Sequence, residues 1–251
     1  MQNYTEKFYK FIDNNALLGA KEVVPFVIEL MQPKSVIDIG CGLATWLAVF
    51  KQHGVEEILG VDGDFVDINK LNIPPEYFLQ HNLLNPLKVE QNFDLAVSLE
   101  VAEHLPIEKA ESFVDTLVNL SPAILFSAAV PYQPGTRHLN CQWPNYWAKI
   151  FSEKGYVLFD CFRMKFWQNP NVPWWYAQNM FLFVKESCWQ NYPILKQNFN
   201  PLNEPPLPII HPEFYLKLQQ GTSINQALSL LMKVISRAIN NKYSLNKSHH
   251  N

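Results

Sequence analysis

One stretch of this chain decides its fold, Val36-Ile-Asp-Ile-Gly-Cys-Gly-Leu-Ala-Thr-Trp-Leu47. A short β-branched run ends near Asp38, passes two glycines and turns helical, which predicts a strand, a tight loop and a helix. Glycine lets such a loop approach a ligand closely because it has no Cβ. A second run, Glu57-Ile-Leu-Gly-Val-Asp62, ends in an acid that is placed to accept hydrogen bonds from ribose hydroxyls. The sequence therefore predicts a site for a nucleoside-bearing cofactor.

The spacing of the glycines distinguishes between cofactors. Nicotinamide and flavin sites favour G-x-G-x-x-G, whereas this chain has Thr45 in the third position. The carboxylate of Asp38 would repel a pyrophosphate but suits a ligand with an ammonium and a sulfonium group. Asp-x-Gly-x-Gly with a later acid resembles the S-adenosylmethionine-dependent methyltransferases of the Rossmann-like class, where Ala44 is often a glycine. The alternative is a glycine turn in a Rossmann-like domain that binds no ligand.

Strand and helix patterns alternate along most of the chain. The sequence is helical in character up to Met31, and Pro33 then ends the helix. Strands are predicted at 35–39, 57–61, 77–80, 93–99, 123–128, 156–162 and 180–184, with helices near 45–53, 107–120 and 145–154. This alternation predicts an α/β fold, a doubly wound seven-stranded sheet with helices on both faces. The family resemblance implies the strand order 3-2-1-4-5-7-6 with the last strand antiparallel.

The C-terminal part differs in composition from the rest. Six prolines between Trp189 and Pro212 are expected to forbid regular structure there. Beyond them, apolar residues from Ile224 to Ala238 recur at helical spacing, which predicts an amphipathic helix. We therefore expect a methyltransferase domain over 1–188 and an appendage, a proline-rich segment and a helix, over 189–251. The helix either packs on its own domain, forms a homodimer contact or covers the active site.

The cofactor residues follow from the topology of an open sheet, whose ligand crevice forms beyond the carboxyl ends of the strands. Residues after Ile39 and Leu99 then face each other across the cleft. The expected cofactor-binding set is Asp38, Gly40, Cys41, Gly42, Asp62, Asn82, Leu83 and Leu99. Within it, Asn82 and Leu83 stand where the family usually has an acid and a hydrophobic residue against the adenine. Asn82 as an ordinary turn residue is the competing interpretation.

Glu100, Glu103 and His104 have the spacing of one helical turn, which would present all three on one face. Two carboxylates and an imidazole there suit a divalent cation or general base catalysis. The E-x-x-E-H pattern resembles ubiquinone-pathway O-methyltransferases and small-RNA 2′-O-methyltransferases, in which matching residues bind a metal. In the RNA family a later histidine completes the site, and His138 is the corresponding candidate. Many metal-free relatives carry a similar turn, so the alternative is that Glu100 contacts the cofactor and His104 packs.

Two polar and aromatic loops are expected on the acceptor side. The first, Tyr132 to Trp143, contains Arg137, His138 and Asn140, and the second runs from Asn171 to Asn179. Tryptophans beside amides suit a sugar ring or a flat amphipathic molecule. The expected substrate residues are Arg137, Asn140, Trp174, Trp175, Tyr176 and Gln178, although the aromatic residues at 174–176 fit a core equally well. The two loops resemble bacterial methyltransferases of polysaccharide and secondary-metabolite pathways.

Composition favours an enzyme of the cytoplasm. A net charge of −3 gives no reason to expect a nucleic-acid partner. The polar N-terminus, the scattered cysteines and the absence of a long apolar run predict a cytoplasmic protein without a membrane span. The expected activity is methyl transfer from S-adenosylmethionine to an oxygen of a small molecule or glycan, with His138 as base and His104 or Glu100 as the other catalytic candidates. N-methylation of an amine or peptide, and a non-catalytic cofactor-binding partner subunit, are the alternatives.

Overall fold

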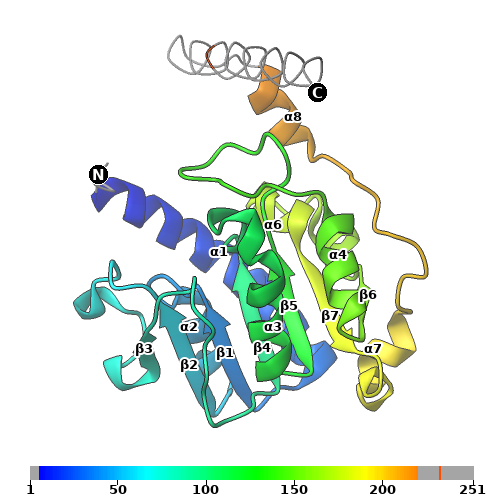
Figure 1. The fold of residues 1–251 in the computed structure, drawn as a ribbon, viewed down its shortest axis with the longest axis horizontal. Coiled ribbons are helices and arrows are strands. Elements are labelled where there is room, and N and C mark those ends of the chain that lie inside the picture. The colour runs from blue at the N-terminus through cyan, green and yellow to red at the C-terminus, as the bar shows by residue number, and fades with distance from the viewer. Residues whose placement is uncertain (1–5, 220–231, 233–251) are drawn as a thin grey trace, which may run out of the picture. The chain divides into compact units, whose positions relative to one another are not determined.

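The computed structural model describes residues 6–219 and residue 232. In this part of the chain, seven strands form one sheet in the order β3-β2-β1-β4-β5-β7-β6 (Figure 1). The strands are β1 Ser35–Ile39, β2 Glu57–Asp62, β3 Phe78–Gln80, β4 Leu95–Leu99, β5 Ala123–Ser127, β6 Tyr156–Phe159 and β7 Phe181–Lys185. β7 is antiparallel to both of its neighbours, and the other pairs are parallel. The predicted order and the antiparallel last strand are confirmed.

Helices cover both faces of the sheet, as Figure 1 shows. Their bounds are α1 Glu6–Met31, α2 Thr45–Gln52, α3 Ala110–Leu120, α4 Pro144–Glu153, α5 Arg163–Phe166, α6 Trp174–Asn179, α7 Pro193–Asn198 and α8 Pro212–Gln219. Successive side chains of β1 enter different cores: Val36 packs with residues of α1 and α2, and Ile37 packs with residues of α3 and α4. Strands buried on both faces read as continuous apolar runs. This explains why β1, β4 and β5 are apolar almost throughout.

The segment from Cys161 to Asn198 differs from its prediction. β6 ends at Phe159 rather than at residue 162, because Asp160 turns away to bind Arg163. The short helix α6 lies within the loop expected at 171–179, and α5 lies where no element was predicted. The proline-rich segment also contains a helix, α7, which begins at Pro193. Proline suits this first position because its missing N–H would have no partner within the helix, so the expectation of no regular structure here was wrong.

The chain divides into two compact units, Met1–His211 and Pro212–Asn251. The first unit contains the sheet and also most of the proline-rich segment. In the second unit the structure describes α8 and residue 232. The predicted amphipathic helix over 224–238, with its dimer or lid role, otherwise lies outside the described residues. None of the helices in the described part of the chain is long and apolar enough to cross a membrane.

Candidate active site

The loop after β1 has the tight geometry that its glycines predict. Gly40 has a φ of +85°, and a Cβ on it would lie 2.4 Å from Cγ2 of Val101. Its N–H donates to the carbonyl of Val61 at 2.8 Å. Gly42 also has a positive φ, of +54°, with open space where a Cβ would be. The first glycine is therefore required by packing, and the second leaves room above the loop.

Two buried carboxylates flank this loop. Asp62 accepts hydrogen bonds from the N–H groups of Gly42 and Gly63, both at 2.7 Å. Burial raises the pKa of Asp62, although these two bonds act in the opposite direction. Burial also raises the pKa of Asp38 well above its ordinary value, and the charge of Asp62 adds to the increase. Because each carboxylate disfavours the ionised form of the other group, a cationic ligand would relieve the unfavourable electrostatics.

The segment after β3 forms a turn beside Asp62. The N–H of His81 donates to the carbonyl of Asp62 at 2.7 Å. The exposed Asn82 accepts from the N–H of Leu84 through its side-chain oxygen at 3.0 Å. This bond belongs to an Asx turn. The competing interpretation of Asn82 as a turn residue is therefore present in the structure. Leu83 is partly buried against the core under α3.

The backbone changes direction at the end of β4. Glu100 has a φ of +57°, and its N–H donates to the carbonyl of Ser127 in β5 at 3.0 Å. Only Ala102–His104 is helical, as a short 3₁₀ turn. Glu100, Glu103 and His104 therefore do not share one helical turn. The prediction was wrong because the left-handed residue Glu100 turns the chain before the helix begins.

Glu103, His104 and His138 come together at this edge, with potential ligand atoms within 4.8 Å of one another. The side chain of Glu103 is fully buried, and neither of its carboxylate oxygens has a hydrogen-bond partner among the described residues. Its backbone carbonyl accepts from the N–H groups of Leu139 and Asn140 at 2.7 and 3.0 Å. These two bonds hold the loop from Tyr132 to Trp143 (the acceptor loop), and with it His138, against the end of β4.

His138 is held in a neutral state. Burial, together with the nearby His104, lowers its pKa to about 4. The two rings meet edge to face with centroids 5.0 Å apart. The ring also lies directly over Gly135, where a Cβ would be 1.9 Å from Nε2 of the imidazole. A neutral imidazole is the form that accepts a proton or binds a metal ion, so the position suits either role.

The residues predicted to bind the acceptor fall into two groups. Arg137 is exposed in the acceptor loop, and Trp175 is partly buried. The others, Asn140, Trp174, Tyr176 and Gln178, are at most 7% exposed. Burial at these positions favours the core interpretation over an open sugar-binding surface. Tyr176 packs edge to face on Trp46 with centroids 5.2 Å apart.

Sequence reasoning missed two residues of this site. The side chain of Gln133 donates to Glu100 at 2.6 Å, and that of Asn179 donates to the same carboxylate at 3.2 Å. Both residues stand in the two loops singled out for acceptor binding. Their amides resemble those of ordinary loop residues, and only the antiparallel pairing of β7 with β5 brings Asn179 beside Glu100.

A pH dependence of stability follows from the Glu100 carboxyl. Burial raises its pKa from 4.5 to about 7, so the folded protein holds a proton that the unfolded chain has released. The free energy of unfolding should then fall by roughly 3 kcal/mol as pH rises from about 4.5 through about 7. Urea titrations of the ligand-free protein at several pH values would measure the slope.

Above pH 6.5 the imidazole of His138 is neutral in both the folded and the unfolded protein, so it does not contribute to the slope. Glu100→Gln should have a flatter profile there; an identical slope would contradict this assignment.

Comparison with known proteins relates this sequence and this fold to methyltransferases. A family model described as a methyltransferase domain matches residues 9–125. Methyltransferases are the family to which this part of the chain is similar. The match covers the glycine loop, both flanking acids and the residues from Glu100 to His104. No curated protein matches the sequence.

Solved methyltransferase structures share the fold of this chain at low sequence identity. An O-methyltransferase family protein from Burkholderia thailandensis has a TM-score of 0.53 and 12% identity over 71% of this chain and 59% of its own. DesVI from Streptomyces venezuelae has a TM-score of 0.53 and 11% identity, over 71% and 95% of the two chains. The methyltransferase domain of bacterial CtHen1-C has a TM-score of 0.51 and 20% identity, over 67% and 98%. At these identities the likeness shows the fold alone.

Proposed function

We propose that this protein transfers the methyl group of S-adenosylmethionine to an oxygen of a small molecule or glycan. One observation carries the proposal: the buried acids Asp38 and Asp62 flank the glycine loop, and the neutral imidazole of His138 lies at the neighbouring strand ends. The acids suit a cation with ribose hydroxyls, and the imidazole suits a hydroxyl that must lose its proton.

In the proposed reaction the acceptor oxygen attacks the methyl carbon in line with the carbon–sulfur bond. That bond breaks, and its electron pair stays on sulfur to give S-adenosylhomocysteine. His138 takes the hydroxyl proton. Holding the two reactants close to attack distance supplies about 7–11 kcal/mol of the barrier reduction at best. The cofactor is tested by calorimetry with S-adenosylmethionine. Heat with a reduced dinucleotide and none with S-adenosylmethionine would refute the proposal.

The donor set of Glu103, His104 and His138 also fits a divalent cation. The carboxylate of Glu103 is buried without a partner among the described residues, which is costly unless a positive charge or a proton accompanies it. One carboxylate and two imidazoles suit Zn²⁺, Mn²⁺ or Fe²⁺ better than Mg²⁺. Such an ion would acidify the acceptor hydroxyl. We therefore include a metal at these residues as a second form of the proposal, in which His138 is a ligand.

Metal binding can be measured without an acceptor. Titration with Mn²⁺, followed by electron paramagnetic resonance, should show one site, and Glu103→Gln should weaken it by about tenfold or more because the charged ligand is lost. Glu108→Gln is the matched control, since Glu108 is exposed on the nearby 3₁₀ turn Ile107–Lys109. Equal Mn²⁺ affinity in wild type and Glu103→Gln would remove the metal form. Full methyl transfer in excess chelator would leave His138 as base.

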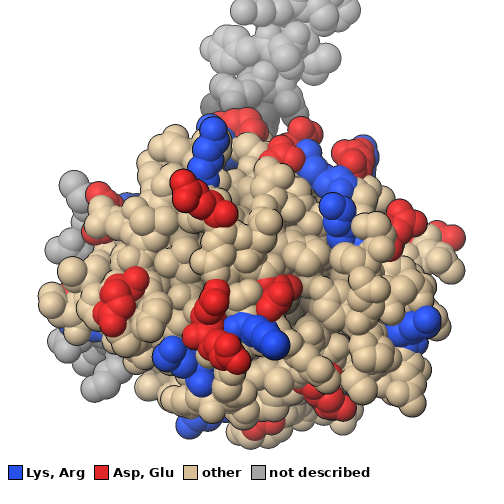
Figure 2. Space-filling view, turned by 90° about the horizontal axis from the view of Figure 1, so that it is seen from below, with Lys and Arg blue, Asp and Glu red and all other residues tan. Residues whose placement is uncertain are grey.

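The alternative functions predict different results for the same variants. A neutral amine needs little help from a base, so N-methylation predicts that His138→Ala stays active. A non-catalytic partner subunit predicts cofactor binding without turnover. RNA is disfavoured because the chain has a net charge of −3. On the face seen in Figure 2, Lys and Arg side chains lie among Asp and Glu side chains. The bacterial CtHen1 likeness shows the fold and does not alter this.

A further inference from the structure

The strap, defined as residues 199–211, is the last part of the first unit. In Figure 1 it runs from α7 up the side of the sheet that ends in β6. The N–H of Leu202 donates to the carbonyl of Leu158 at 2.8 Å, and Arg163 donates to the carbonyl of Leu207 at 2.7 Å. Two hydrogen bonds of its last residue, His211, lead toward the site. The ring bonds to the carbonyl of Trp167 at 2.8 Å, and the backbone N–H donates to Oε1 of Gln178 at 2.7 Å.

The second bond of His211 begins a chain of side-chain amides. A backbone N–H only donates, so the Gln178 oxygen must face it and the Gln178 nitrogen must point away. That nitrogen donates to Oδ1 of Asn179 at 2.9 Å. The Asn179 nitrogen is then directed at Oε1 of Gln133, at 2.8 Å, and at Glu100. Gln133 in turn presents its nitrogen to Glu100 at 2.6 Å.

The orientation of each amide thus follows from the one before it. A second backbone donor, the N–H of Val130, faces Oε1 of Gln133 at the other end, but at 3.4 Å. Its bond is the longer and weaker of the two. The donors at both ends of this series of amides favour the same orientation. As a result, Asn179 and Gln133 present their N–H groups, and not their amide oxygens, to the carboxylate of Glu100.

The two carboxylates of this site show what these donors do. Burial raises the pKa of Glu103 well above its ordinary value, with the charge of Glu100 as a further cause, while the nearby backbone N–H groups of Glu103 and Ala129 act in the opposite direction. Burial acts on Glu100 as well, but hydrogen bonds from Asn179, Ser127 and Gln133 oppose it and limit the pKa to about 7. Two other titratable groups face this cluster, the phenol of Tyr176 and the thiol of Cys141. Burial raises the pKa of each, and the charge of Glu100 adds to the increase.

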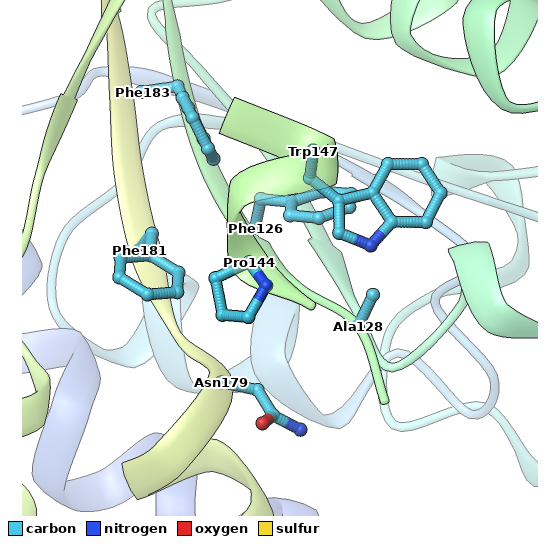
Figure 3. A pocket seen from close by; sticks show the side chains of 7 residues that line it. All are labelled: Phe126, Ala128, Pro144, Trp147, Asn179, Phe181 and Phe183. Atoms are coloured by element: carbon cyan, nitrogen blue, oxygen red, sulfur yellow. The ribbon is translucent and has the colours of Figure 1, made fainter. Parts of the chain in front are cut away.

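The surroundings leave the amides few other partners. Behind Asn179 is a cavity of about 10 Å³ lined by Phe126, Trp147, Phe181 and Phe183 (Figure 3). A space of this size holds one water molecule at most. Gln178 and Asn179 are 1% and 2% exposed. In such an environment a reversed amide would leave a buried donor or acceptor unpaired, which costs about 1–3 kcal/mol.

We propose that the strap is a positioning element of the active site, in which the backbone N–H of His211 orients the amides of Gln178, Asn179 and Gln133 toward Glu100. His211 and Gln178 are positioning residues, since they act on the carboxylate through Asn179. Glu100 follows β4, which pairs with β1, and the charges of Glu100 and Asp38 both act on the phenol of Tyr176. Above about pH 7, where Glu100 is ionised, its charge favours a sulfonium over the neutral thioether of the product. This last consequence rests on the proposed function, whereas the orientation does not.

Side-chain amide signals in ¹H–¹⁵N NMR spectra of the full chain test the orientation directly. Asn179→Leu and Gln133→Met assign the two signals. In Gln178→Met, which keeps the side-chain length and removes both polar groups, the Asn179 amide protons should shift and exchange with solvent at least about tenfold faster. Unchanged Asn179 and Gln133 signals in a folded Gln178→Met protein would overturn the proposal.

A matched control separates orientation from a loosened strap. Arg163→Lys removes the fork that binds Asp160 and Leu207 but leaves the bond between His211 and Gln178 in place. It should leave the Asn179 signal unchanged, and an equal effect of both variants would also overturn the proposal.

Calorimetry provides a second measurement: Gln178→Met should reduce the preference for S-adenosylmethionine over S-adenosylhomocysteine by about threefold or more. If wild type binds neither, the proposed function fails while the NMR signals still decide the orientation.

Discussion

Gly40→Ala is expected to lower the affinity for S-adenosylmethionine by about a hundredfold or more, because the loop would have to move from under the ligand. The new Cβ would lie 2.4 Å and 2.7 Å from the two methyl groups of Val101 and 3.1 Å from its Cβ. Rotation of Val101 cannot relieve contacts with both methyls. The φ of +85° adds strain for any residue with a side chain. Calorimetric titration of the variant measures the loss.

Gly54→Ala is the control for this variant. Gly54 has a φ of +91° after α2, and nothing lies within 4 Å of the position of a Cβ. It should therefore lose stability by about 1 kcal/mol through backbone strain alone and bind the cofactor normally. Val101→Ala, added to Gly40→Ala, removes the contacts with the two methyl groups and should restore part of the affinity. Normal binding by Gly40→Ala would show that the loop does not form the cofactor site.

His138→Ala is expected to reduce turnover on a hydroxyl acceptor by about 10²–10⁴-fold, the usual contribution of a general base. Its neutral imidazole lies in the acceptor loop, which the backbone of Glu103 holds in place. The affinity for S-adenosylhomocysteine should not change, because His138 lies outside the glycine loop and its flanking acids. The production of S-adenosylhomocysteine with a panel of hydroxylated small molecules and glycans measures the effect.

His53→Ala provides the comparison, since His53 is exposed at the end of α2. It should turn over as wild type does. Wild-type turnover by His138→Ala on a hydroxyl acceptor would exclude this residue from the mechanism. A loss of both turnover and Mn²⁺ affinity in His138→Ala would assign it as a metal ligand, whereas a loss of turnover alone would assign it as base.

The backbone conformation of Glu100 shows when the spacing of residues in a sequence predicts their arrangement in space. The E-x-x-E-H spacing correctly indicates a polar cluster after β4, but spacing implies a shared helical face only where the backbone is helical. Glu100 has a φ of +57°, so it leaves the strand in another direction and meets Gln133 and Asn179 instead. Nothing in the sequence around Glu100 indicates a left-handed residue, which is uncommon outside glycine and asparagine.

The sequence alone determined the sheet, the glycine loop and the two acids beside it, because these depend on local patterns: alternating strands and helices, and residues at the end of β1 and β2. The partners of Glu100 depend on contacts between residues far apart in the chain. Asn179 meets Glu100 because β7 pairs with β5, and His211 meets Gln178 because the strap returns along the sheet. Such contacts are fixed by the packing of whole elements, which no local pattern encodes, so only the tertiary structure decided them.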